Sequence, residues 1–73
     1  MATRLERFIT QNDMKPAQIA REAGISRAYL LRVRKGHADP TRAVMVRIAA
    51  ACSYLLRRKI EVRQLFNLTV RWR

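Results

Sequence analysis

The chain has 73 residues and a mass of 8.6 kDa, and its 16 Lys and Arg against 5 Asp and Glu give a net charge of +11. This length allows one small domain, which buries only about 60% of the surface that the unfolded chain exposes. A single cysteine excludes an internal disulfide, and Cys52 with His37 are too few ligands for a structural zinc site. We therefore expect no metal and no cofactor. Stability must come from helix packing, from oligomerisation or from both.

No apolar run approaches the roughly 18 residues that would suggest a membrane span, and no secretory leader opens the sequence. A single thiol fits a reducing compartment. The sequence therefore predicts a cytoplasmic protein without a membrane partner.

The positive charge is concentrated in two places. One cluster without any acid consists of Arg27, Arg32, Arg34 and Lys35, and the second consists of Arg57, Arg58, Lys59 and Arg63. Such a charge on a small body repels itself, and a polyanion such as DNA, RNA or an anionic membrane would offset that repulsion. The second cluster either holds a DNA backbone or is a solvated end that complements a helix dipole, and we favour the solvated end.

The first half of the chain predicts two helices with clear ends. Thr3 and Glu6 have the spacing of a capping box, which predicts a helix over residues 4–12. Its apolar stripe contains Leu5, Phe8 and Ile9. Pro16 at a first helical position and Gly24 after a last one predict a second helix over residues 16–23. We expect Gly24 to adopt the left-handed conformation that ends a helix.

Three more helices are expected in the second half. Ser26 is a good N-cap for a helix over residues 27–35, which Leu30 and Val33 would anchor and Gly36 would end. Asp39 as cap and Pro40 as first residue predict a long helix that reaches about residues 56–58. Its inward stripe contains Val44, Ile48, Ala51, Cys52 and Leu55, which makes Cys52 a core residue. A short helix over residues 62–66 would close the core.

The second and third helices, joined by a short turn that contains Gly24, have the form of a helix-turn-helix. Two helices that cross at a steep angle need a small residue where they meet, and Ala20 supplies it. With Leu30 and Val33 directed inward, the other residues of the third helix are free to face a DNA major groove.

Residues 18–30, from Gln18-Ile19-Ala20 through Ala23-Gly24-Ile25-Ser26, resemble the Q-x-A-x-x-A-G-[IV]-S stretch of the Cro/repressor-type helix-turn-helix regulators, the XRE family. Further matches are Gly36, Asp39-Pro40-Thr41, Ile48-Ala49-Ala50-Ala51 and Leu65-Phe66, so the resemblance covers about residues 4–66. It implies an all-α, five-helix, lambda-repressor-like DNA-binding domain over residues 1–66, followed by a tail over residues 67–73. The chain departs from the family at Leu31, usually polar or small, at Arg34, usually an acid, and at Pro16, often Gln.

The resemblance also implies site residues. The bases would be read by Arg27, Ala28 and Arg32. Arginine can bind guanine with two hydrogen bonds, and an alanine methyl suits a thymine methyl. The DNA backbone would be contacted by Lys15, Gln18, Tyr29, Lys35, His37 and Arg42. Leu31 either reads a thymine methyl or packs on the loop before the fourth helix, and we favour packing.

The last residues alternate between apolar and polar, which is a strand period. A strand that places Leu68, Val70 and Trp72 on one face could pair with its two-fold mate in a homodimer. Folding back on the same domain and a frayed tail are the alternatives.

The sequence thus predicts a sequence-specific regulator that binds double-stranded DNA, most simply a small repressor that binds a palindromic operator as a homodimer. No small-molecule ligand is expected. No enzyme is indicated, because the chain offers no carboxylate pair, catalytic triad or phosphate-cradling loop. Two alternatives stay open: a nonspecific nucleic-acid binder, and a protein-interaction module such as an antitoxin or a phage protein that acts on host machinery.

Overall fold

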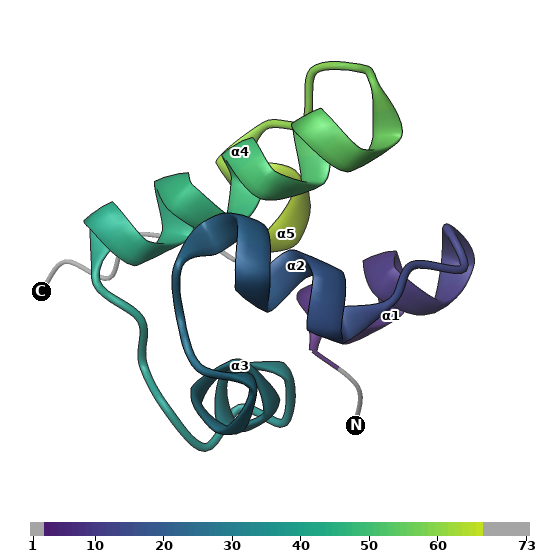
Figure 1. Ribbon diagram of the computed structural model, residues 1–73. Coiled ribbons are helices and arrows are strands. Elements are labelled where there is room, and N and C mark those ends of the chain that lie inside the picture. The colour runs from purple at the N-terminus through teal and green to yellow at the C-terminus, as the bar shows by residue number, and fades with distance from the viewer. Residues whose placement is uncertain (1–2, 67–73) are drawn as a thin grey trace, which may run out of the picture.

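The computed structural model describes residues 3–66, which form five helices and no strand (Figure 1). In chain order these are α1 (Arg4–Gln11), α2 (Pro16–Ala23), α3 (Arg27–Arg34), α4 (Arg42–Leu56) and α5 (Val62–Leu65). The all-α prediction is confirmed. The predicted strand with Leu68, Val70 and Trp72 lies outside the described residues. Within residues 3–66, every helix is too short or too polar to cross a membrane.

One apolar core joins all five helices. Each helix contributes a large side chain that is at most 1% exposed, namely Leu5, Ile19, Leu30, Ile48 and Leu65. The helix α2 packs against both α3 and α4, while α5 packs against α1 and α4. Because α3 joins the core through only one side, its other side is left for solvent or a partner (Figure 1).

The first and third helices begin at the predicted caps. The hydroxyl of Thr3 accepts a 3.0 Å hydrogen bond from the Glu6 N–H, and the hydroxyl of Ser26 accepts one of 3.0 Å from the Tyr29 N–H. Of the two hydrogen bonds of the predicted capping box, only the one that the Thr3 hydroxyl accepts is formed as expected. The Glu6 carboxylate binds a guanidinium of α3 instead. The helix α1 ends one residue earlier than predicted, with Asn12 as its C-cap.

The second helix has both predicted ends. It begins at Pro16 and ends before Gly24, whose φ of +72° is the expected left-handed conformation. A contact that the sequence did not predict fixes this end on α4. The Arg47 guanidinium donates hydrogen bonds to the carbonyls of Ala23 (3.0 Å) and Gly24 (3.1 Å). Those carbonyls lie at the helix end, where backbone acceptors lack intrahelical donors.

The predicted start of the fourth helix was wrong. Thr41, and neither Asp39 nor Pro40, precedes the first helical residue, and its hydroxyl accepts a 3.2 Å hydrogen bond from the Val44 N–H. Threonine and aspartate are both good caps, and they stand two residues apart here. The helix ends at Leu56, and Arg57 follows in a left-handed conformation with φ of +57°.

Candidate nucleic-acid interface

The helix α3 has one buried side and one exposed side. Leu30 and Val33 are 1% and 5% exposed and anchor it to the core. Each residue of an α-helix is rotated by about 100° around the helix axis relative to the one before it. This spacing puts Ala28, Leu31, Arg32 and Lys35 near the middle of the exposed side and Arg27 at its edge next to α2, and all five residues are exposed.

The turn that precedes α3 has the predicted helix-turn-helix construction. Ala20 is 2% exposed where α2 packs against α3, and Gly24 supplies the left-handed turn. Ile25, in the turn, is half-buried against the core, and its N–H donates to the Ala20 carbonyl at 3.0 Å. The small residue, the glycine and the apolar anchor thus hold α3 across the end of α2 (Figure 1).

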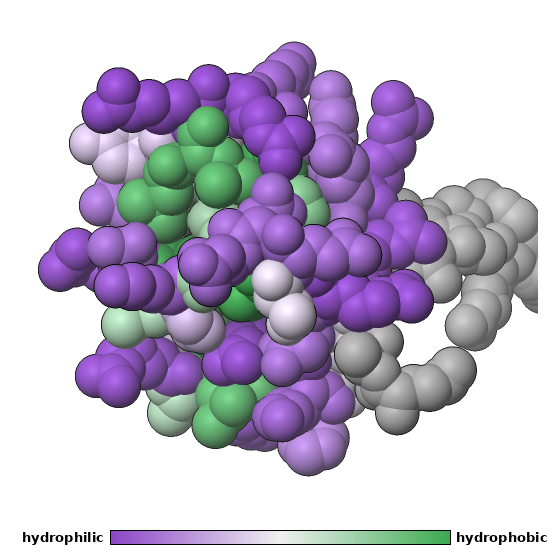
Figure 2. Space-filling model, turned by 90° about the vertical axis from the view of Figure 1, so that its right-hand side faces the viewer, coloured by the Kyte–Doolittle hydropathy of each residue, from purple (hydrophilic) through white to green (hydrophobic). Residues whose placement is uncertain are grey.

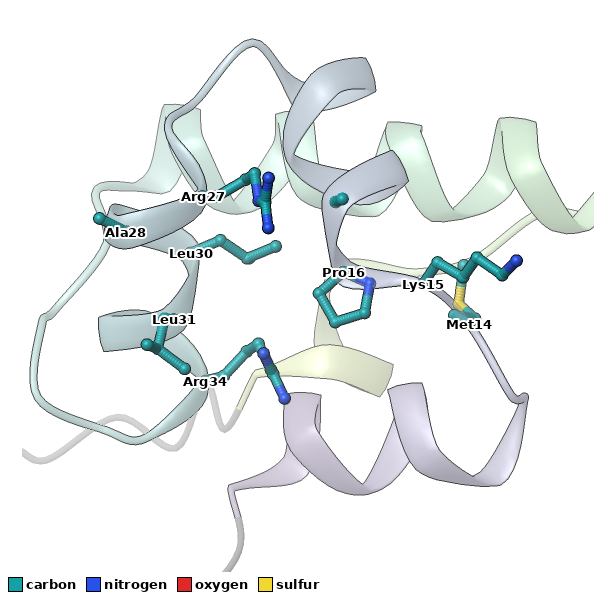
Figure 3. Close-up of a pocket in the computed structure, with 9 residues that line it drawn as sticks. Met14, Lys15, Pro16, Arg27, Ala28, Leu30, Leu31 and Arg34 are labelled. Atoms are coloured by element: carbon teal, nitrogen blue, oxygen red, sulfur yellow. The ribbon is translucent and has the colours of Figure 1, made fainter.

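A groove separates α3 from the start of α2 (Figure 3). It is lined by Met14, Lys15, Pro16, Ala17, Arg27, Ala28, Leu30, Leu31 and Arg34. Arg27, Leu30 and Arg34 extend from α3 toward Pro16. The groove therefore combines apolar side chains with three cationic ones, and it brings the predicted backbone residue Lys15 and the predicted base-reading residues Arg27 and Ala28 to one surface.

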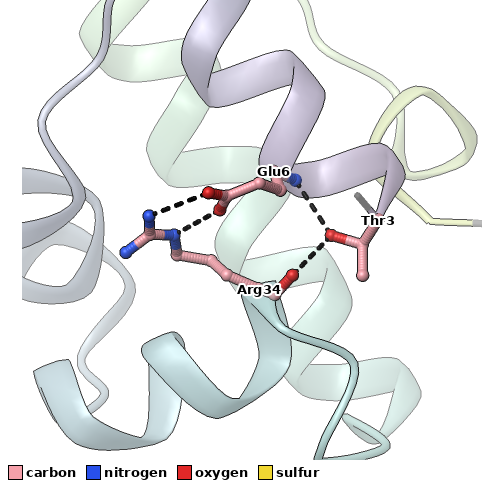
Figure 4. Close-up of polar contacts among 3 residues, drawn as sticks. All are labelled: Thr3, Glu6 and Arg34. Carbon is pink, nitrogen blue, oxygen red and sulfur yellow. Dashed lines mark hydrogen bonds and ion pairs between the residues drawn. The ribbon is translucent and has the colours of Figure 1, made fainter. Parts of the chain in front are cut away.

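Arg34 is the cation of α3 whose charge is compensated. Its Nε donates to Glu6 Oε1 at 2.7 Å and its Nη2 donates to Glu6 Oε2 at 3.2 Å (Figure 4). These hydrogen bonds, together with the positive charge of Arg34 and Lys35, lower the pKa of the Glu6 carboxyl below its usual value. The Thr3 hydroxyl also donates to the Arg34 carbonyl at 2.7 Å. The last turn of α3 is therefore fixed to the first turn of α1.

The other predicted backbone residues surround α3. Lys15 and Gln18 lie at the start of α2, Lys35 and His37 follow α3, and Arg42 opens α4, all of them exposed. Tyr29 is half-buried and packs against the core. The assignment of these residues to the DNA backbone stays a prediction.

The second cationic cluster lies elsewhere. Arg57, Arg58 and Lys59 follow α4, at the end of α4 that lies away from α3, whereas Arg63 belongs to α5 (Figure 1). Within this cluster, Arg58 donates from Nη2 to the Asn12 side-chain oxygen at 3.0 Å, and Lys59 lies 4.0 Å from the Glu61 carboxylate. The right-hand side of the molecule in Figure 1 faces the viewer in Figure 2. Hydrophilic side chains cover most of this face and surround an apolar patch.

Cys52 is fully buried in the core, as predicted. Burial raises the pKa of its thiol to about 11, so the nucleophilic thiolate is scarce at neutral pH. Among residues 3–66, no group of three or more His, Cys, Asp or Glu side chains is placed to hold a metal ion.

Comparison with known proteins places this geometry in a family. No curated protein and no solved structure gives a significant match to the chain. A family model described as helix-turn-helix, of the XRE type, matches residues 5–56, which include α2, the turn, α3 and α4. This match covers most of the chain and agrees with the geometry of the turn and of α3, and the chain therefore belongs to the Cro/repressor-type, or XRE-type, helix-turn-helix family of DNA-binding regulators.

Proposed function

We propose that this protein is a sequence-specific transcriptional regulator, a small repressor that inserts α3 into the major groove of double-stranded DNA. The observation that carries the proposal is the exposed side of α3. It presents Arg27, Arg32 and Lys35 without an acid, while the opposite side is anchored in the core. An α-helix with its side chains is about 10–12 Å in diameter, and the major groove of B-DNA, about 12 Å wide, admits it.

Chemistry assigns a role to each side chain. Arg27 and Arg32 would each bind the O6 and N7 atoms of a guanine, and Ala28 would contact a thymine methyl. Residues in and around α3 would position the domain on phosphates, namely Lys15, Gln18, Tyr29, Lys35, His37 and Arg42. The backbone N–H groups at the start of α2 would add to the phosphate contacts because a helix N-terminus attracts anions.

A homodimer on a palindromic operator completes the proposal. One recognition helix covers only part of a helical turn of DNA. Two copies related by a two-fold axis would read half-sites about 34–36 Å apart. We assign residues 1–66 to the DNA-binding domain and residues 67–73 to a tail in which Leu68, Val70 and Trp72 would pair two copies. The protein would then repress by covering a promoter, without a small-molecule ligand or a catalytic step.

Selection of bound sequences from a random duplex pool tests this function. The expected result is an enriched palindrome whose half-sites have the spacing of one helical turn or a multiple of it. Enrichment of a single half-site would show specific binding without the dimer. A pool that binds without enrichment would contradict sequence-specific recognition and favour a nonspecific nucleic-acid binder.

A further inference from the structure

Leu31 is a large apolar side chain on the exposed side of α3. It is 45% exposed, and it is not among the apolar side chains that pack against the core. The other large apolar residues that are this exposed within residues 3–66 are Val46 and Tyr54, and both belong to α4. A single exposed leucine is common on protein surfaces and needs no explanation by itself. Its surroundings distinguish it.

Leu31 is part of a wider apolar surface with charges at its border. It shares the groove beside α2 with Ala28, Pro16 and other apolar side chains, and Arg27 and Arg34 line the same groove (Figure 3). Arg32 is its neighbour in the sequence and is exposed on the same side of α3. A polyanion attracted by Arg27 and Arg32 would therefore cover Leu31 and remove it from water.

We propose that Leu31 is a specificity-determining residue that recognises the C5-methyl group of a thymine. This inference rests on the proposed insertion of α3 into the major groove. The thymine methyl is the apolar group that base pairs display in that groove, and aliphatic side chains contact it. Residues three apart on a helix are about 4.5 Å apart along its axis, which is close to the 3.4 Å rise of a base pair. Ala28 and Leu31 can therefore contact methyl groups of neighbouring base pairs.

The test uses the duplex that the random pool yields and replaces its thymines one at a time with deoxyuridine. Uracil keeps the Watson–Crick pairing and lacks only the methyl group. The wild-type protein should lose affinity at two thymines of each half-site, one that contacts Ala28 and one that contacts Leu31. At the thymine that contacts Leu31 the loss should be about fourfold, which corresponds to one methyl-sized group left unburied. Leu31→Ala removes this contact from both half-sites of the palindrome, so it should bind the parent duplex roughly sixteenfold more weakly, the square of the about fourfold loss at one half-site. Uracil at the thymine that contacts Leu31 should cause no further loss in this variant, whereas uracil at the thymine that contacts Ala28 should still weaken binding.

Val46→Ala is the matched control because Val46 is 49% exposed and lies on α4. It should bind like the wild type and keep the full uracil effect. Circular dichroism should show the same helix content for all three proteins.

Two results would overturn the proposal. One is that every uracil effect of the wild type persists in Leu31→Ala, and the other is the absence of any thymine position at which uracil weakens binding of the wild type. Either result would show that Leu31 recognises no thymine methyl and faces a protein partner or solvent. An enriched operator together with one of these results would refute only the role of Leu31. A pool without enrichment would refute the proposed function and this inference with it.

Discussion

The carboxylate of Glu6 in α1 accepts two hydrogen bonds from the guanidinium of Arg34 in α3, at 2.7 and 3.2 Å. The two residues are 28 positions apart in the sequence, and their side chains are only 24% and 20% exposed. Bidentate pairs between arginine and a carboxylate have a fixed geometry and are stronger than neutral hydrogen bonds. The pair therefore fixes the position of α3 relative to α1, from the end of α3 that is opposite to its N-cap.

Glu6→Gln should lower the free energy of unfolding by about 1 kcal/mol, because it removes an ion pair that is partly shielded from solvent. Urea denaturation measures the change. Arg34→Gln should have a similar effect, and the double variant should lose less than the sum of the two. Glu22→Gln is the control, since it removes the same charge from an exposed position of α2. Additive losses in the double variant would show that the pair does not stabilise the fold.

The stabilisation by Glu6 should depend on pH in one direction. The pKa of Glu6 in the folded protein lies below its ordinary value of 4.5, so folding favours the ionised form. This contribution is present above the ordinary value and is lost as the pH falls through the lower, folded pKa. The difference in unfolding free energy between wild type and Glu6→Gln should therefore be smaller at about pH 3 than at about pH 7. A difference that stays constant over this range would contradict the assignment.

The helices could be predicted from the sequence wherever local chemistry decides their ends. Pro16 and Gly24 fixed both ends of α2, since proline suits a first helical position and glycine a left-handed one. The predicted start of α4 was wrong because Asp39 and Thr41 are both good caps and the sequence alone does not rank them. Cys52 was correctly placed in the core because its apolar neighbours recur at the helical period.

The long-range polar contacts could not be predicted, because a helical pattern shows which face a residue occupies and not what lies opposite that face. Thr3 and Glu6 match a capping box, so the pattern gave Glu6 a local partner, whereas a guanidinium of α3 is the stronger one. Arg47 likewise has the pattern of a solvated cation, and it binds the carbonyls at the end of α2. For the candidate site, the sequence predicted the exposed residues of α3, and the groove beside α2 became visible only in the structure.

Gly24→Ala should destabilise the protein by about 1–2 kcal/mol, because the left-handed conformation is costly for a residue with a Cβ. An added Cβ would also lie 2.6 Å from Nη2 of Arg47 and disturb its hydrogen bonds to the end of α2. Thermal denaturation measures the loss. Arg57→Gly is the converse test, since Arg57 has a φ of +57°, and it should stabilise the protein by up to about 1 kcal/mol. Equal effects of the same sign would refute this account.

Ser53→Ala should destabilise the connection between α4 and α5. The Ser53 hydroxyl donates to the Ala49 carbonyl at 2.8 Å and accepts a 2.8 Å hydrogen bond from the N–H of Ile60, a residue that is 4% exposed. Without the hydroxyl, the Ile60 N–H lacks this acceptor, which should cost about 1–3 kcal/mol in urea denaturation. Thr10→Ala, on the exposed surface of α1, is the control and should change stability by less than about 0.5 kcal/mol.

Arg27→Ala and Arg32→Ala should each weaken binding to the selected operator by about 1–3 kcal/mol and relax the preference at one base pair. Competition between the operator and single-base variants measures both effects. Arg63→Ala removes the same charge from α5, which packs against α1 and α4, and it should leave the base preferences unchanged. If either α3 variant loses the same affinity on every sequence, its arginine contacts phosphate and reads no base.

The affinity for the operator should fall steeply with salt. If about six to eight phosphates are neutralised, the logarithm of the binding constant should decrease with the logarithm of the salt concentration with a slope of about −5 to −7. Lys35→Ala should reduce this slope by about 1, since Lys35 is exposed directly after α3 and is proposed to contact a phosphate. Arg63→Ala should leave it unchanged. A slope near zero would exclude a nucleic-acid partner, and equal changes in both variants would show a response to net charge and no phosphate contact by Lys35.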